Sequence, residues 1–65
     1  MQFKIMGAKG DTVLDYDVET GAIKFEELVN ANMLPVEVTS EGNKLMKSFD
    51  STVEKVIWLP KLKGG

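Results

Sequence analysis

The chain ends with the segment Val53-Glu54-Lys55-Val56-Ile57-Trp58-Leu59-Pro60-Lys61-Leu62-Lys63-Gly64-Gly65. The apolar run from Val56 to Leu59 contains the only tryptophan and predicts a strand that is buried on at least one face. Pro60 is expected to end the pairing of this strand, because proline has no backbone N–H to donate. The polar spacer and the two glycines that follow have little to pack. The segment therefore predicts a folded domain over residues 1–60 and a flexible, accessible tail over residues 61–65.

The rest of the chain shows strand periodicity, then helical periodicity, then strand periodicity again. Apolar residues alternate with polar ones in the first two strands, and a Gly-rich turn between them predicts a β-hairpin. In the third strand, Val36 and Val38 are expected to face inward. The predicted strands are residues 2–6, 12–18, 35–39, 44–49 and 56–59.

One helix is predicted between the second and third strands, from Ile23 to Asn32. Thr20 is its candidate N-cap and Asn32 its candidate C-cap, and Pro35 prevents continuation. A helix of about ten residues is too short to be stable alone, so it must lie on the hairpin.

The element order β-β-α-β-β-β predicts an α+β fold of the β-grasp arrangement. In this fold a mixed sheet of four to five strands packs on one helix, in two layers. The first and last strands are expected to pair in parallel at the centre of the sheet. They are the two most apolar strand segments, as central strands should be.

Composition excludes several classes of function. The chain has 65 residues, ten acids and eight lysines, a net charge of −2, and no arginine, cysteine or histidine. The absence of arginine argues against a nucleic-acid partner, and no apolar run is long enough to span a membrane. Without His, Cys or Arg the usual nucleophile–base pairs cannot be built, so we expect a non-enzyme without a cofactor. The lack of cysteine and of a signal peptide is consistent with a cytoplasmic location.

A metal site is also not expected. The segment 15–26 has acids at the first, third, fifth and twelfth places, as a calcium loop does. Its glycine falls seventh instead of sixth and its apolar residue ninth instead of eighth, and no helix precedes it.

The two ends and the element order together resemble a known family. The chain opens Met1-Gln2-Phe3-Lys4-Ile5 and closes Leu59-Pro60-Lys61-Leu62-Lys63-Gly64-Gly65. In this it resembles ubiquitin and the ubiquitin-like sulfur carriers of the ThiS and MoaD kind. The resemblance implies that an E1-like activating enzyme adenylates the carboxylate of Gly65, for sulfur transfer or for conjugation to a lysine. Gly64 would supply a neck narrow enough for the enzyme's channel.

The resemblance also implies recognition surfaces. Lys61, Leu62 and Lys63 would contact the activating enzyme. If Val56 and Trp58 face inward, Ile57 and Leu59 would form the counterpart of ubiquitin's apolar patch, and Met46 would be a further member. The chain departs from ubiquitin in Pro60 and in having lysines where ubiquitin has arginines beside the patch and tail.

A second interpretation assigns no role to the tail. The chain is also similar to small phage-encoded proteins with a Gly-Gly end. In this interpretation it is a β-grasp protein-interaction module that works through its sheet face or by self-association. Its partners would be other proteins, and the protein itself a monomer or weak homodimer.

Overall fold

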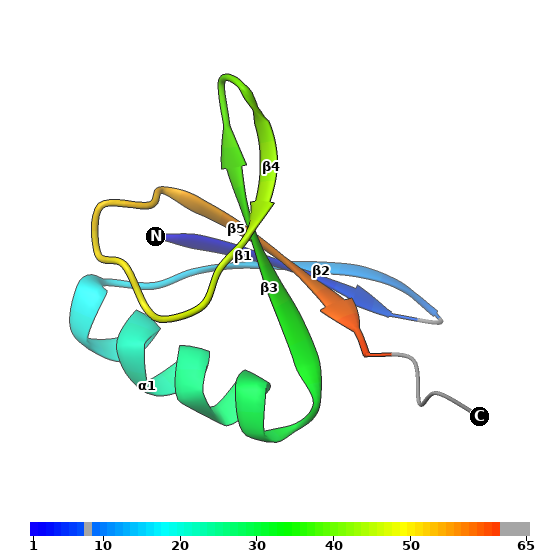
Figure 1. Cartoon of the computed structure of the whole chain (residues 1–65). Helices are drawn as coiled ribbons and strands as arrows, with labels where there is room; N and C mark the ends of the chain where they lie inside the picture. The colour runs from blue at the N-terminus through cyan, green and yellow to red at the C-terminus, as the bar shows by residue number, and fades with distance from the viewer. Residues whose placement is uncertain (8, 62–65) are drawn as a thin grey trace.

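The computed structural model describes residues 1–7 and 9–61 and shows an α+β fold, with one helix packed on a five-stranded mixed sheet (Figure 1). The elements in chain order are β1 (Gln2–Gly7), β2 (Gly10–Asp15), α1 (Val18–Asn30), β3 (Met33–Thr39), β4 (Gly42–Leu45) and β5 (Lys55–Pro60). The fold class predicted from the sequence, a mixed sheet on one helix, is confirmed.

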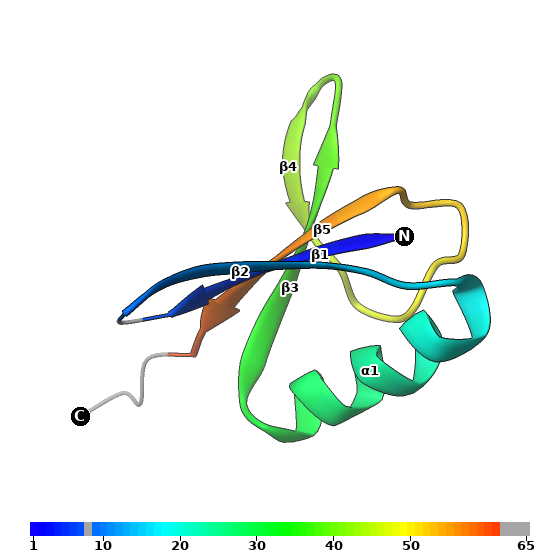
Figure 2. The same cartoon turned by 180° about the vertical axis from the view of Figure 1, so that it is seen from behind.

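The strands lie in the order β2-β1-β5-β3-β4, so the last strand of the chain is the middle strand of the sheet (Figure 2). β1 and β5 pair in parallel, with Phe3 opposite Val56 and Ile5 opposite Trp58. The β1–β2, β3–β4 and β3–β5 pairs are antiparallel. The predicted parallel pairing of the first and last strands is therefore confirmed.

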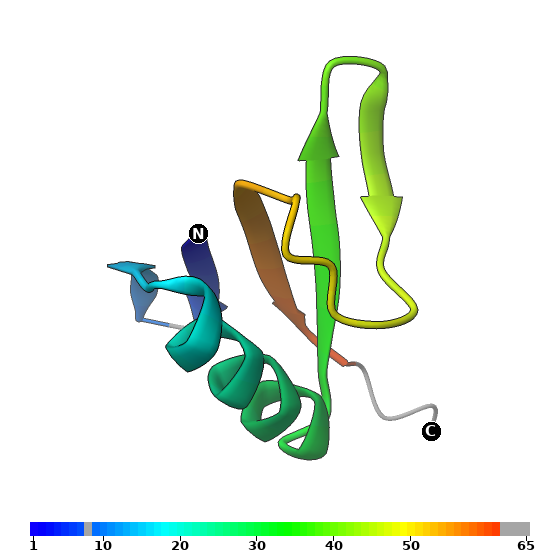
Figure 3. The same ribbon diagram turned by 90° about the vertical axis from the view of Figure 1, so that its left-hand side faces the viewer.

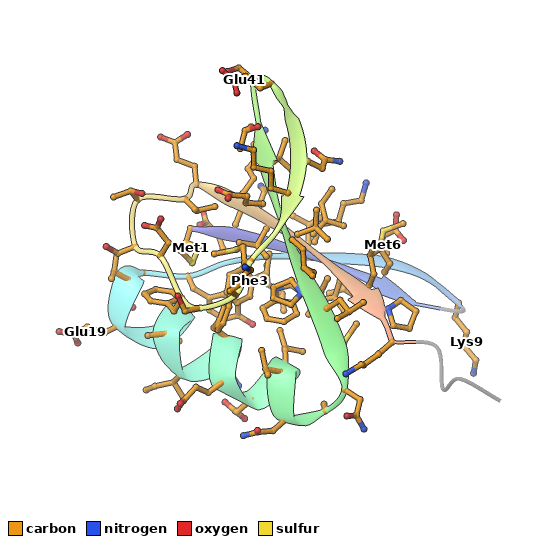
Figure 4. The ribbon with its side chains drawn as sticks, viewed as in Figure 1. Met1, Phe3, Met6, Lys9, Glu19 and Glu41 are labelled. Carbon is orange, nitrogen blue, oxygen red and sulfur yellow. The ribbon has the colours of Figure 1, made fainter. Side chains whose placement is uncertain are left out.

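The core lies between the sheet and α1 and is built around Trp58, which is completely buried. The ring of Trp58 makes edge-to-face contacts with Phe3, at a centroid distance of 5.4 Å, and with Phe25 of α1, at 5.1 Å. Phe3 points into the space between the sheet and the helix (Figure 4). Val56 is also buried, so Val56 and Trp58 both face inward, as the sequence analysis supposed. These aromatic contacts hold α1 on the sheet.

The helix begins five residues earlier than predicted. Its N-cap is Asp17, whose carboxylate accepts a hydrogen bond of 2.7 Å from the N–H of Thr20, so Thr20 is a donor instead of the cap. Gly21 lies inside the helix, where a Cβ would come within 3.2 Å of Met1 Sδ. Glycine thus allows α1 to approach the start of β1, a role that the sequence pattern did not reveal.

The helix ends close to the predicted place. The last helical residue is Asn30, Ala31 is the C-cap, and Asn32 adopts a positive φ of 64°. Asparagine tolerates this left-handed conformation, which turns the chain directly into β3.

Two predicted strand ends are wrong. β2 ends at Asp15 instead of Val18, because Asp17 caps the helix. β4 ends at Leu45 instead of Phe49: Met46 N–H donates to Pro35 O, and Pro35 has no N–H to return the bond. The segment 46–54 then crosses to the helix side of the sheet (Figure 3). The ring centroids of Phe49 and Phe25 lie 5.6 Å apart.

Pro60 does not end all pairing of β5. It lies opposite Met33, and Lys61 N–H donates to Asn32 O at 3.1 Å, so pairing with β3 continues past the proline. The Lys61 N–H points toward β3. Because successive backbone N–H groups of a strand point to opposite sides, the nitrogen of Pro60 points the other way, toward β1. On that side the pairing ends with Trp58. The N–H that Pro60 lacks therefore limits only the parallel pairing of β5 with β1.

The stability of the fold is expected to fall at low pH through two carboxylates that accept local hydrogen bonds, that of the N-cap Asp17 and that of Asp50 in a turn. The Thr20 N–H beside Asp17 lowers the pKa of that carboxyl from its ordinary value, and the hydroxyl and N–H of Thr52 lower the pKa of Asp50 likewise. A group whose pKa is lower in the folded state stabilises it above the unfolded pKa, and this stabilisation is lost as the pH falls through the folded pKa.

The variant Asp17→Asn/Asp50→Asn tests this, because asparagine accepts the same hydrogen bonds but does not titrate in this range. Between roughly pH 5 and pH 2 its urea midpoint should fall less than that of the wild type. Identical pH dependence of the urea midpoints of the variant and the wild type would show that these two carboxylates do not control acid unfolding.

Candidate functional site

The register of the sheet divides its side chains between two faces. Residues that are directly opposite each other in neighbouring strands point to the same face. Ile57 lies opposite Lys4 of β1 and Val36 of β3, and Val36 lies opposite Leu45 of β4. This row points away from the face that carries Trp58, and so away from α1.

A contiguous apolar surface, here called the outer patch, lies on this face. Leu59 is opposite Leu34, one row from the pair Ile57–Val36. The outer patch consists of Leu34 and Val36 of β3, Leu45 of β4, and Ile57 and Leu59 of β5. Leu45 is 57% exposed and Leu59 38% exposed, while the other three are half-buried. Among the described residues, α1 and the segment 46–54 lie on the opposite side of the sheet (Figures 2 and 3).

The half of this face formed by β1 and β2 is mainly polar. Lys4 forms an ion pair of 3.7 Å with Asp11, and the Asp15 side chain is mostly exposed. Val13, opposite Lys4, is an isolated exposed aliphatic residue within this half. On the β1 side the outer patch is therefore bordered by the charged Lys4 beside Ile57, while the half-buried Met6, two residues further along β1, is an apolar residue of the same face.

A cleft of about 180 Å³ opens beside the outer patch, at the edge of β3. Its apolar walls come from the C-terminal half of α1, the first half of β3 and the end of β4. Leu34 and Leu45 line the cleft and also belong to the outer patch, so the two features are continuous. Within residues 1–7 and 9–61, the charged side chains of the lining are those of Lys47 and Lys61.

The predicted site residues are distributed unequally between these features. Ile57 and Leu59 lie together on the outer face, as expected once Val56 and Trp58 face inward. Met46 does not join them: it is only 8% exposed and packs in the core. Lys61 lines the cleft.

The rest of the predicted tail site, Leu62, Lys63, Gly64 and Gly65, lies outside the described residues.

Several residues of the outer face and the cleft were not predicted from the sequence. Val36, predicted to face inward, lies on the outer face, as does Val38, which is 40% exposed. Leu34, Leu45 and Lys47 were not singled out. The signal was ambiguous, because β3 has apolar residues on both faces and residues 44–49 have no regular alternation. Only pairing with β5 determines which side of β3 is exposed.

The described residues offer binding surfaces more readily than reactive groups. No group of three or more carboxylates that could hold a metal ion is found within residues 1–7 and 9–61. The buried Nε1 of Trp58 has no hydrogen-bond partner there, but it lies in the aromatic core and not in the cleft lining. No helix in the same ranges is long and apolar enough to cross a membrane.

Comparison of the chain with protein-family models, curated proteins and solved structures finds no match. The outer patch and the cleft are therefore the features from which a function can be inferred.

Proposed function

We propose that this protein is a protein-interaction module that binds a partner protein through the outer patch. The observation that carries the proposal is the continuity of the patch, in which five aliphatic side chains from three strands lie side by side. Single exposed apolar residues are normal on a protein surface, whereas contiguous ones mark sites of interaction. In this proposal the protein acts by binding, without catalysis, in the cytoplasm.

A second candidate is the ubiquitin-like carrier or modifier. The observation that favours it is the strand order, because a central β5 parallel to β1, with one helix on the sheet, is compatible with a β-grasp-like fold. In this candidate function an E1-like enzyme converts the Gly65 carboxylate to an acyl-adenylate, releasing pyrophosphate from ATP. A sulfur nucleophile or a lysine amine then displaces AMP. Gly64 provides the narrow neck, and residues 61–63 contact the enzyme.

Two variants separate these proposals in one experiment in the protein's own host. Leu59→Lys places a charge in the outer patch, at a side chain that is already partly exposed. Deletion of Gly64 and Gly65 leaves the patch intact. The interaction proposal expects Leu59→Lys to reduce the amount of a cross-linked partner protein by about tenfold or more, and the deletion to leave it unchanged. The carrier proposal expects the deletion to abolish a C-terminal thiocarboxylate, or a Gly-Gly isopeptide, detected by mass spectrometry.

Ile23→Lys is the matched control, because Ile23 is 62% exposed on α1 and lies outside the outer patch. It should retain the same partner at wild-type yield, and circular dichroism should show that both lysine variants fold. Wild-type recovery with Leu59→Lys, or equal loss with Ile23→Lys, would contradict the interaction proposal.

A further inference from the structure

In the part of the chain that the structure describes, one edge of β3 has no strand paired with it beside the cleft. β4 pairs with β3 only from Val36 to Thr39, and one further bond joins Met46 N–H to Pro35 O. β3 therefore pairs with β5 from Met33 to Glu37 on one side, but on its other side it pairs with a strand only along its second half.

The backbone of Met33 faces this free edge. Lys61 N–H donates to Asn32 O, so the backbone groups of Asn32, Leu34 and Val36 point toward β5. The backbone groups of Met33 and Pro35 point away from β5. The hydrogen bond that Pro35 O accepts from Met46 N–H shows this direction. The N–H and C=O of Met33 are thus oriented to pair with an extended segment lying along the edge.

The cleft beside this edge has the size and polarity of a pocket for one apolar side chain. Its volume of about 180 Å³ is similar to that of a cavity of about 150 Å³ that can hold a benzene ring. Its walls include Val29 of α1, Met33 and Leu34 of β3, and Leu45 of β4. A side chain entering it would extend the apolar contact of the outer patch around the edge of the sheet.

The charge of the cleft lining indicates the charge of the partner segment that it would bind. Among the described residues, Lys47 and Lys61 are part of the lining and no Asp or Glu is. The chain as a whole has more acids than lysines and a net charge of −2. The cleft is therefore cationic on a negatively charged protein, which favours carboxylates from a partner over basic groups.

We propose that the cleft binds an extended acidic segment of a partner protein. One aromatic or aliphatic side chain of the segment occupies the cleft, its backbone pairs with Met33, and neighbouring carboxylates contact Lys47 and Lys61. The inference rests on the proposed interaction function. It adds the chemistry of the partner segment that would bind beside Leu34 and Leu45, where the outer patch meets the cleft.

The test is an NMR titration of the ¹⁵N-labelled full chain with three blocked pentapeptides. The first is Asp-Glu-Phe-Glu-Asp, the second replaces its phenylalanine by glycine, and the third replaces its four acids by lysine. Only the first should bind measurably, with the largest amide shifts at Met33 and Lys47. Equal binding of all three peptides, or shifts centred away from the cleft, would overturn the proposal.

Charge reversal then tests the lysines. Lys47→Glu and Lys61→Glu should each weaken binding of the acidic phenylalanine peptide by about tenfold. Lys55→Glu is the matched control, because it makes the same change of net charge at the start of β5, outside the lining. It should bind as the wild type does. Equal weakening in all three variants would show a long-range charge effect and would overturn the site.

The variant Leu59→Lys distinguishes failure of this inference from failure of the proposed function. Leu59 belongs to the outer patch but not to the cleft lining, so Leu59→Lys should still bind the peptide at wild-type affinity. If the peptide does not bind the wild type while Leu59→Lys loses the partner in the host, the outer patch is supported and the cleft proposal is wrong. If single-stranded oligouridylate shifts the cleft amides and the acidic peptide does not, the assignment to a protein segment is wrong.

Discussion

Trp58→Ala is expected to remove a large part of the protein's free energy of unfolding. Trp58 is completely buried at the centre of the sheet and contacts both Phe3 and Phe25. Truncation of a buried tryptophan to alanine costs about 3–5 kcal/mol. A domain of this size has a free energy of unfolding of only about 3–10 kcal/mol, at the usual 0.05–0.15 kcal/mol per residue. Urea titration followed by circular dichroism would measure the loss directly.

Trp58→Phe should be much less harmful than Trp58→Ala. The indole Nε1–H is buried without a hydrogen-bond partner among the described residues. Burial of an unsatisfied polar group costs about 1–3 kcal/mol, and phenylalanine removes that cost while filling most of the space. We expect the free energy of unfolding to change by less than about 1.5 kcal/mol, as in size-conserving hydrophobic exchanges. A loss as large as that of Trp58→Ala would show that the Nε1–H group itself stabilises the fold.

Phe25→Ala is the second substitution expected to have a large effect. Phe25 is the one buried aromatic residue of α1, only 5% exposed, and its ring contacts those of Trp58 and Phe49. Removing it should cost about 3–5 kcal/mol and weaken the attachment of both α1 and the segment 46–54. Because a 13-residue helix is marginal by itself, helical circular dichroism should decrease together with the tertiary signal of the tryptophan.

Ile23→Ala is the control for Phe25→Ala on the same helix. Ile23 is mostly exposed, and alanine is the better helix former, so the unfolding free energy should change by less than about 0.5 kcal/mol. If Phe25→Ala were as mild as Ile23→Ala, the aromatic contacts of Phe25 would not hold α1 on the sheet.

The periodicity of the sequence was sufficient to predict the main elements. Alternation with a period of two indicates strands and a period of 3.6 indicates a helix, and both are local properties of the chain. The apolar run from Val56 to Leu59 also predicted the central strand, because a strand with neighbours on both sides needs few polar residues. The inward position of Val56 and Trp58 then placed Ile57 and Leu59 together on the opposite face.

Element boundaries depended on contacts that the local pattern does not contain. Asp17 and Thr20 are both good N-cap residues, and local propensity did not decide between them. The close approach of Gly21 to Met1 brings the first turn of α1 onto β1 and accommodates the earlier start. Likewise, Leu45 and Met46 are adjacent apolar residues. β4 ends where Met46 pairs with Pro35 of β3, and there Leu45 is exposed while Met46 is buried in the core.

The sequence by itself determined an α+β domain with a central C-terminal strand, because hydrophobic periodicity and turn residues act over a few neighbouring positions. Only the tertiary structure decided which apolar residues of β3 and β4 are exposed, and that Lys47 and Lys61 lie beside one cleft. The physical reason is register: a strand with apolar residues on both faces can be paired so that either face is buried. The side that becomes a surface is set by strands distant in the sequence.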